Sequence, residues 1–168
     1  MRDKYAHCVL VGDFGVGKTT LSNKFLSQRI DNAFDFIDAD FQAIDLEHKD
    51  QTTHLSIWDT RAQERFRMLP PQFFRKAAVV IFVYAVDSRD SFRNLTMWHT
   101  EAQRHISAEC RTMLVGNKAD SDNERKVTRE EGLRLREQLG INEFCETRSD
   151  SFREVEWMFY KAVFADFD

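Results

Sequence analysis

Hydrophobic residues form short continuous runs along the chain, and these runs alternate with segments of helical periodicity. Continuous apolarity is typical of strands that are covered on both faces, as in a mostly parallel sheet. The runs that predict buried strands are residues 8–11, 55–58, 77–86 and 113–116. The segments that predict helices are residues 18–26, 91–106, 128–139 and 151–165.

The order of these elements predicts an α/β fold. A strand followed by a helix, repeated along the chain, implies right-handed crossovers and an open, doubly wound sheet with helices on both faces. Residues 40–47 and 52–58, joined by the polar segment 48–51, predict one antiparallel hairpin at an edge. Ligands of such sheets bind at the carboxyl ends of the strands, so the loops that follow the strands are the candidate site.

Composition and charge narrow the class of protein. The 168 residues are 42% hydrophobic and 31% charged, which fits a single globular domain over residues 1–168. The net charge of -4 argues against nucleic acid as a partner, because binding a phosphate backbone requires a clustered cationic face. The N-terminus lacks the apolar core of a signal peptide, and no run of about 18 apolar residues could cross a bilayer. We therefore expect a cytoplasmic protein.

The three cysteines, Cys8, Cys110 and Cys145, are far apart and odd in number. This pattern predicts neither a disulfide framework nor a zinc site with paired ligands. Buried free thiols in a reducing compartment are the simpler interpretation.

A glycine-rich loop is predicted directly after the first strand. Residues 12–19 read GDFGVGKT, with the spacing of glycines, lysine and threonine that defines a phosphate-binding loop. Glycines let the backbone turn its N–H groups inward around anionic oxygens, and the following helix adds the positive end of its dipole. The alternative is an ordinary glycine-rich turn with a chance lysine. The apolar strand before the loop and the helix after it favour the phosphate-binding interpretation.

The residues of this loop have distinct expected roles. Lys18 supplies a cation for the terminal phosphates, and the hydroxyl of Thr19 is a hard oxygen ligand of the kind that Mg²⁺ prefers. The residues expected to contact the nucleotide are Gly15, Val16, Gly17, Lys18, Thr19 and Thr20.

A second polar loop, residues 117–120, follows the apolar run 113–116. The ionised Asp120 accepts two hydrogen bonds, which suits the ring N–H and the exocyclic amine of guanine and does not suit adenine. A site that accepts hydrogen bonds from these two groups of the ligand strongly rejects an analogue that lacks them. The sequence Asn-Lys-x-Asp alone is a weak motif, but its place after a buried strand favours guanine. Asn117, Lys118 and Asp120 are therefore the expected base-binding residues.

Two residues between these loops are candidates for the chemistry. Asp59 follows the apolar run 55–58, where a carboxylate that holds Mg²⁺ through a water is expected. Gln63, four residues later, is placed to orient an attacking water. The alternative for both residues is a solvated loop.

These motifs resemble those of the Rab branch of the Ras-like small GTPases over essentially the whole chain. The matching segments are GDxGVGKT at 12–19, WDT at 58–60, QERFR at 63–67, GNKAD at 116–120, and the shorter segments 40–41, 73–77 and 82–84. The resemblance implies the P-loop small GTPase fold with a six-stranded sheet, and a GTP/GDP switch with bound Mg²⁺. It also implies effector and regulator proteins that bind through the switch regions, and a role in vesicle transport at the cytosolic face of endomembranes.

The resemblance also concerns residues 146–149 and the chain end. Residues 146–149, Glu-Thr-Arg-Ser, are similar to the family's second base-contacting loop, so Arg148 and Ser149 are expected to contact guanine through their backbones. The family usually ends in a flexible tail with lipid-bearing cysteines, whereas this chain stops at Asp168 without one. We expect that such a tail was trimmed and that membrane contact occurs only through it.

The departures from the family concentrate where the third phosphate is sensed and cleaved. Residues 28–50 contain no Ser or Thr. In the family, a threonine of the first switch closes on Mg²⁺ and the third phosphate, and Phe36 or Ile37 occupies its position here. Ala62 replaces a glycine whose N–H turns toward the third phosphate. Phe14 stands in the phosphate loop where the family generally has a small residue. These departures leave nucleotide binding intact and predict impaired hydrolysis.

Three functions remain open at this point. The leading one is a Rab-like GTPase with slow hydrolysis, in which Gln63 orients water, Lys18 and Mg²⁺ neutralise charge, and Thr19 and Asp59 hold the metal. The second is a pseudo-GTPase, a nucleotide-bound scaffold that no longer cycles and that partner proteins recognise. The third is a phosphate-loop ATPase.

Two aromatic residues of the predicted helix 151–165, Trp157 and Phe164, fall on the face opposite its other apolar residues. Those residues are Phe152, Val155, Phe159 and Ala162. Because only one face can join the core, we expect the aromatic pair to be exposed, either as surface aromatics or as a contact for a partner.

Overall fold

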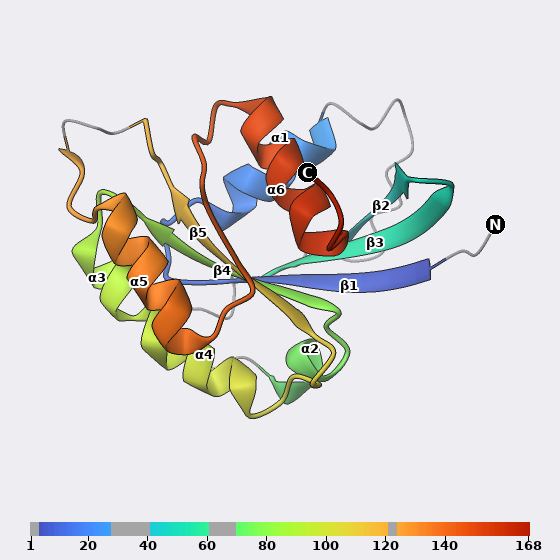
Figure 1. Cartoon of the computed structure of the whole chain (residues 1–168), viewed down its shortest axis with the longest axis horizontal. Helices are drawn as coiled ribbons and strands as arrows, with labels where there is room; N and C mark the ends of the chain where they lie inside the picture. The colour runs from blue at the N-terminus through green and yellow to red at the C-terminus, as the bar shows by residue number, and fades with distance from the viewer. Residues whose placement is uncertain (1–3, 28–40, 61–69, 121–123) are drawn as a thin grey trace.

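The computed structural model describes residues 4–27, 41–60, 70–120 and 124–168, which are coloured in Figure 1. The strands are β1 Lys4–Val11, β2 Phe41–His48, β3 Gln51–Asp59, β4 Val79–Ala85, β5 Arg111–Asn117 and β6 Glu143–Glu146. The helices are α1 Lys18–Ser27, α2 Pro71–Arg75, α3 Arg89–Arg93, α4 Leu95–Gln103, α5 Arg129–Leu139 and α6 Phe152–Val163. No helix in these ranges combines the length and the apolarity needed to cross a membrane.

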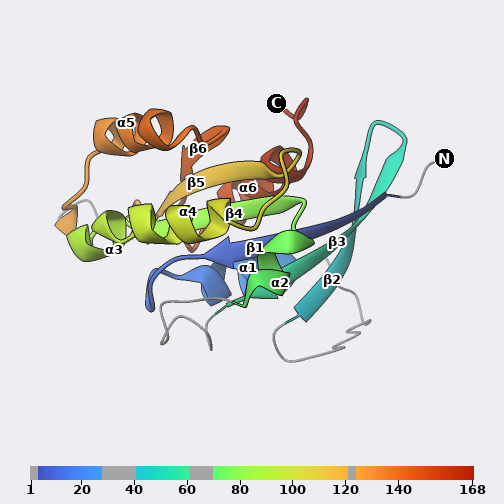
Figure 2. The same cartoon turned by 90° about the horizontal axis from the view of Figure 1, so that it is seen from below.

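The strands form one sheet in the order β2-β3-β1-β4-β5-β6. The β2–β3 pair is antiparallel and every other pair is parallel. Helices α1 and α6 cover one face, and α2 to α5 cover the other (Figures 1 and 2). The α/β fold, the doubly wound six-stranded sheet and the edge hairpin predicted from the sequence are thus confirmed.

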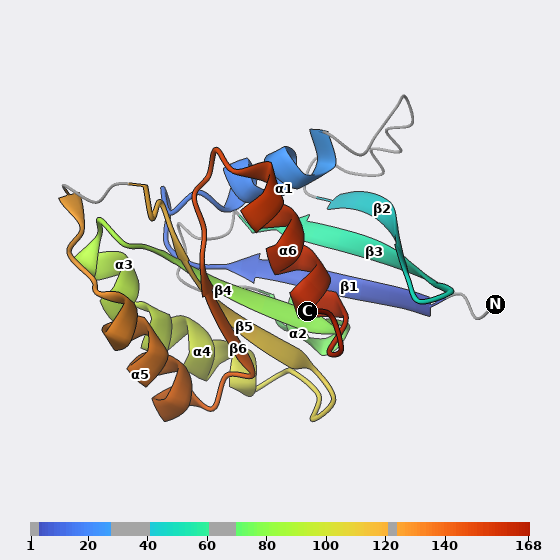
Figure 3. The same ribbon diagram turned by 45° about the horizontal axis from the view of Figure 1, so that its top comes forward.

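Two separate apolar cores follow from this layering. On one face, α1 and α6 lie side by side (Figure 3), and the rings of Phe25 and Phe159 stack with centroids 4.4 Å apart. On the other face, Trp98 and Phe82 are buried with side chains from α4 and β4. Every residue of β4 is buried, which explains why its sequence is continuously apolar.

Two elements were not located by the hydrophobic pattern. Strand β6 has only four residues, two of them glutamates, and it becomes a strand because it pairs with β5 from Met113 to Gly116. Helix α2 has five residues and begins with Pro71 at its first turn, where proline is tolerated. Such short elements are set by tertiary contacts rather than by periodicity.

The predicted helix 91–106 is wrong in its extent. The structure divides it into α3 and α4, with Asn94 between them, and starts it at Arg89. Ser88 caps the N-terminus, since its side chain accepts a hydrogen bond from Ser91 N–H. The amide side chain of Asn94 binds Asp13 in the phosphate loop instead of facing solvent.

The prediction of an exposed aromatic pair on α6 is wrong for Phe164. Helix α6 ends at Val163, and Phe164 leaves the helical conformation with φ -110° and ψ 111°. Its side chain is 6% exposed and packs against Tyr160 and His48, at ring-centroid distances of 5.7 and 4.9 Å. Trp157 is 37% exposed and stands apart from it. Helical periodicity failed here because it was extended past the end of the helix.

The start of α5 is held by a capping box and by an ion pair with α3. The N–H of Thr128 donates to the Glu131 carboxylate at 2.8 Å, and the Thr128 hydroxyl accepts from the Glu131 N–H. Arg89 donates to both carboxylate oxygens, at 2.7 and 3.1 Å. The Arg89 bonds, followed by the Thr128 N–H, lower the pKa of Glu131 to about 2.

Replacing Glu131 with glutamine is expected to lower the thermal midpoint of unfolding by a few degrees at pH 7. Because the pKa of Glu131 is lower in the folded chain, its contribution to stability is complete above about pH 4.5 and is lost as the pH falls toward 2. The difference in midpoint between wild type and variant should shrink over that range in calorimetry. Glu130→Gln, at the exposed neighbouring residue, is the control. Equal effects of the two substitutions would contradict this assignment.

Candidate functional site

The phosphate loop predicted at residues 12–19 joins the end of β1 to the start of α1. Two of its glycines are required by close approaches as well as by positive φ. A Cβ on Gly12 would overlap the carbonyl of Val83, and a Cβ on Gly17 would overlap the side-chain amide of Asn117. Gly12 and Gly17 have φ values of 155° and 100°. The loop is therefore pressed against β4 on one side and against the end of β5 on the other.

The ammonium of Lys18 lies inside this loop. Lys18 is 3% exposed, and its Nζ donates to the carbonyl oxygens of Gly12 at 2.6 Å and Asp13 at 2.9 Å. A buried ammonium is stable only when it is well hydrogen-bonded. The loop thus holds a cation at its centre, next to the first turn of α1, which is an arrangement suited to anionic oxygens.

Asn117 joins the phosphate loop to the two loops predicted to contact the base. It is completely buried, and its Nδ2 donates to the carbonyl of Val16 at 2.9 Å. Its Oδ1 accepts from the hydroxyls of Thr147 at 2.9 Å and Ser149 at 3.3 Å. The structure therefore brings together three segments that are far apart in the sequence.

Lys118 and Asp120 complete the loop that follows β5. Lys118 has a positive φ of 60°, and its Nζ donates to the carbonyl of Gly15 at 2.8 Å, so its side chain lies across the phosphate loop. Asp120 is exposed at the end of the loop. The N–H of Ala119 donates to the carbonyl of Thr147 at 3.0 Å, which holds this loop beside the one after β6.

Arg148 has a partner that the sequence did not predict. Its backbone N–H donates to Glu154 Oε2 at 2.7 Å, and its Nε donates to Glu154 Oε1 at 3.2 Å. Arg148 therefore ties the loop after β6 to α6 with the N–H that was expected to face a base. Ser149 is the residue of this pair that lies toward Asn117.

A cavity of about 270 Å³ opens between the phosphate loop, the first turn of α1 and Lys118. It is lined by Phe14, Gly15, Gly17, Lys18, Thr19, Thr20 and Lys118. The side chain of Val16, which was also predicted to contact the nucleotide, is buried at 2% exposure and faces the core. Phe14 is 79% exposed, so its ring stands at the rim of the cavity.

The structure describes Thr19 and the backbone of Asp59, the two residues predicted to hold Mg²⁺. Thr19 lies in the first turn of α1 and lines the cavity. Asp59 ends β3 and pairs with Leu10 of β1, and the next residue, Thr60, donates its hydroxyl to the Leu10 carbonyl at 2.8 Å. The end of β3 is thus fixed beside the phosphate loop. Gln63 lies outside the described residues.

The donor set fits a magnesium ion better than a transition metal. Thr19 and Asp59 are oxygen ligands, and Mg²⁺ is usually bound by one or two protein oxygens together with phosphates and waters. Within the described ranges, no group of three or more His, Cys, Asp or Glu side chains could hold a metal.

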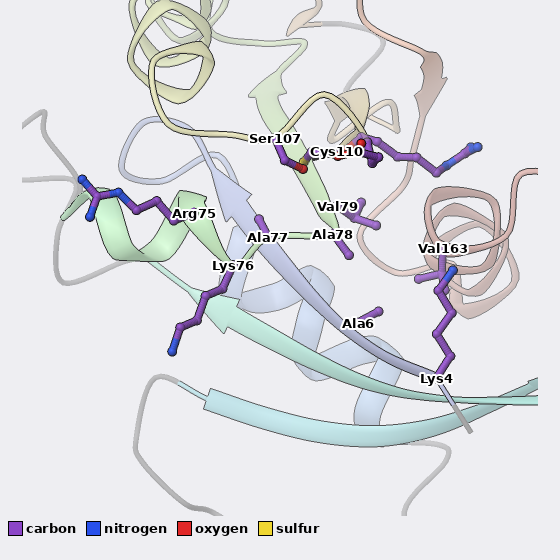
Figure 4. A pocket seen from close by; sticks show the side chains of 12 residues that line it. Lys4, Ala6, Arg75, Lys76, Ala77, Ala78, Val79, Ser107, Cys110 and Val163 are labelled. Atoms are coloured by element: carbon purple, nitrogen blue, oxygen red, sulfur yellow. Dashed lines mark hydrogen bonds between the residues drawn. The ribbon is translucent and has the colours of Figure 1, made fainter. Parts of the chain in front are cut away.

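A larger cavity, of about 360 Å³, lies at the opposite end of the sheet. Its rim carries basic residues, but Figure 4 shows the side chains of Arg75 and Lys76 extending away from Cys110. The Arg111 guanidinium is bound to the carbonyls of Ala162 and Lys161 at the end of α6. These cations do not converge on one point, so this cavity does not compete with the phosphate loop as the candidate site.

Four residues that hold the loops of the candidate site were not predicted from the sequence. Thr147 holds Asn117, and recognition of β6 would have been the signal for it, because Thr147 follows that strand. Asp13, Asn94 and Trp98 form a hydrogen-bonded group that no local pattern reveals.

Comparison with known proteins agrees with this geometry. The model of the Ras family matches residues 7–165. The chain is 39% identical to the Ras-related protein RABC2a of Arabidopsis thaliana over 153 residues. This alignment covers 90% of this chain and 72% of that protein. It is 35% identical to the Ras-related protein Rab-8B of Homo sapiens, over 90% and 73% of the two chains. It is 33% identical to the Ras-related protein SEC4 of Candida albicans, over 95% and 76%. The chain therefore belongs to the Ras family of small GTPases, and within it to the Rab branch.

Proposed function

We propose that the chain is a Rab-like guanine-nucleotide switch that acts in vesicle trafficking and hydrolyses GTP slowly. The observation that carries the proposal is the position of Asn117. Its buried side chain binds the phosphate loop through Val16 and the loop after β6 through Thr147. One ligand that spans these loops would have phosphates at one end and a base at the other.

The roles of the binding residues follow from this arrangement. The ammonium of Lys18 neutralises phosphate charge, and the N–H groups of the loop and of the first turn of α1 donate to phosphate oxygens. The carboxylate of Asp120 accepts hydrogen bonds from the guanine edge. Lys118 lies against the phosphate loop through Gly15, so its aliphatic stem can cover the base.

Thr19 and Asp59 are the residues that would hold Mg²⁺. When bound, the ion supplies positive charge to the terminal phosphates. The hydroxyl of Thr60, bound to Leu10, keeps the end of β3 in register with β1, which positions Asp59 at the carboxyl edge. Residues 28–40 and 61–69 would carry the switch regions that effector and regulator proteins read.

Slow hydrolysis is proposed because the positions that act on the third phosphate are altered. Phe14 lines the same cavity as Lys18 and Thr19, and its large ring occupies space that a small residue would leave to water. The alternative is a pseudo-GTPase scaffold. It is favoured by the absence of Ser and Thr from residues 28–50. In either case we propose that the protein acts at the cytosolic face of endomembranes.

The direct test is to purify the protein, denature it, and identify the nucleotide that is released. We expect GDP or GTP at close to one molecule per chain. Release of ATP, or of no nucleotide even after incubation with GDP and Mg²⁺, would contradict the proposal. Hydrogen exchange with GDP and with a non-hydrolysable GTP analogue then separates switch from scaffold, because a scaffold should give the same exchange pattern with both.

Replacing Phe14 with serine is expected to raise the single-turnover rate of GTP cleavage by about tenfold, since general base and water-positioning effects are worth at least that much. The gain should disappear when Gln63→Leu is added, because Gln63 is the residue proposed to orient the attacking water. Affinity for GDP should not change, since the exposed ring does not hold the diphosphate. An unchanged rate in Phe14→Ser would remove Phe14 as the cause of slow hydrolysis.

A further inference from the structure

Asp13, the second residue of the phosphate loop, is held by two side chains of the α3–α4 region. Its Oδ2 accepts a hydrogen bond from Asn94 Nδ2 at 2.6 Å, and its Oδ1 accepts one from the indole Nε1 of Trp98 at 2.9 Å. Trp98 is 1% exposed, and a buried indole N–H requires an acceptor. The carboxylate of Asp13 provides that acceptor.

The backbone of the same residue holds the phosphate-binding lysine. Lys18 Nζ donates to the carbonyl of Asp13 at 2.9 Å, next to its bond with Gly12. Asp13 therefore binds α4 with its side chain and Lys18 with its main chain. The position of the ammonium in the loop is in this way tied to the position of α4.

The rest of the loop is anchored to a different part of the fold. The carbonyls of Gly15 and Val16 accept from Lys118 and Asn117 of the base loop. Glycine-rich backbone has high conformational freedom, so each anchor restricts states that the loop would otherwise visit. Asp13 anchors the start of the phosphate loop, and the base loop anchors Gly15 and Val16.

We propose that Asp13 is a positioning residue, which together with Asn94 and Trp98 holds the phosphate loop and Lys18 in the geometry that retains a nucleoside diphosphate or triphosphate. The inference rests on the proposed function, because it concerns the phosphate end of the same nucleotide site. It assigns to α4 a part in nucleotide retention, although α4 contributes no residue to the lining of the cavity.

The direction in which nucleotide affinity changes when the Asp13 carboxylate is removed distinguishes a positioning role from a purely electrostatic one. A carboxylate near phosphates repels them, so its removal would tighten binding if charge were its only role. Removal of a positioning residue weakens binding, because the loop and the lysine gain freedom that the ligand must then restrict. The two roles therefore predict opposite changes in affinity.

The test is a comparison of GDP and guanosine, which share the base and differ in the phosphates. Asp13→Ala should lower the affinity for GDP by about 10- to 100-fold, which is the range for loss of charge-assisted hydrogen bonds. The affinity for guanosine, measured by displacement of a fluorescent nucleotide, should not change. Trp98→Phe keeps the ring and removes only the N–H donor, and it should lower the affinity for GDP by about threefold to tenfold. Trp157→Phe, at the exposed tryptophan of α6, is the matched control.

The double variant Asp13→Ala, Trp98→Phe should bind GDP about as Asp13→Ala does, because Asp13→Ala already removes the one bond that Trp98→Phe deletes. An unchanged or higher affinity of Asp13→Ala for GDP, or an equal loss for GDP and guanosine, would overturn the inference. If Asp13→Ala does not fold, Trp98→Phe and Asn94→Ala decide on the same criteria. A wild-type protein that does not bind GDP would instead refute the proposed function, so the two failures are distinguishable.

Discussion

Replacing Lys18 with alanine is expected to lower the affinity for GDP by at least about 100-fold, because it removes the charged partner of a buried anion. Lys18 combines nearly complete burial with a place in the cavity lining and two bonds to loop carbonyls. With alanine, the phosphate loop itself would offer the phosphates only neutral N–H donors and the helix dipole. The measurement is the dissociation constant for a fluorescent GDP, obtained by titration with Mg²⁺ present.

The effect of Lys18→Ala should be confined to the phosphate end of the ligand. The carbonyls of Gly12 and Asp13 would lose their donor, so some loosening of the loop is expected as well. Lys24→Ala is the matched control, because Lys24 lies in the same helix and does not line the cavity. A Lys18→Ala protein that retains GDP as the wild type does would show that the nucleotide is not held by this loop.

The contrast between Lys18 and Asp13 shows what the sequence could predict about this site. The role of Lys18 depends on local order, since an apolar strand, a glycine-rich turn and a helix follow one another within residues 4–27. The role of Asp13 depends on Asn94 and Trp98, which are 81 and 85 residues away in the chain. The spacing of a motif can therefore predict the role of Lys18. The role of Asp13 depends on the packing of α4 on β4, which motif spacing does not contain.

The same distinction applies to the fold. The apolar strands β1, β4 and β5 could be predicted because burial on both faces leaves a continuous hydrophobic run. Strand β6 and helix α2 are short and partly polar, and they form because neighbouring elements supply partners. Phe164 was misplaced because it lies one residue beyond the end of α6, where the backbone turns it into the core.

Replacing Asp120 with asparagine is expected to reverse the base preference of the site. An aspartate accepts two hydrogen bonds, whereas an asparagine presents one acceptor and one donor. Guanine donates from its ring N–H and from its exocyclic amine, so one of these two groups would face the amide donor of the variant. Xanthine carries a carbonyl oxygen in place of the exocyclic amine and pairs with that donor. The affinity for GDP should fall by about 10,000-fold, and xanthosine diphosphate should become the better ligand.

The structure supplies a reason why this substitution should leave the rest of the site in place. The bonds that join the three loops run through Asn117, Lys118 and Thr147, and Asp120 is exposed beyond them. Competition of GDP and xanthosine diphosphate for the variant is the measurement. Asp150→Asn, which removes an exposed carboxylate from the neighbouring loop, is the control and should leave GDP as the preferred ligand. If Asp120→Asn still prefers GDP, the base is read by another group, and the pairing proposed for Asp120 is wrong. If it loses both ligands, Asp120 supports the loop instead of recognising guanine.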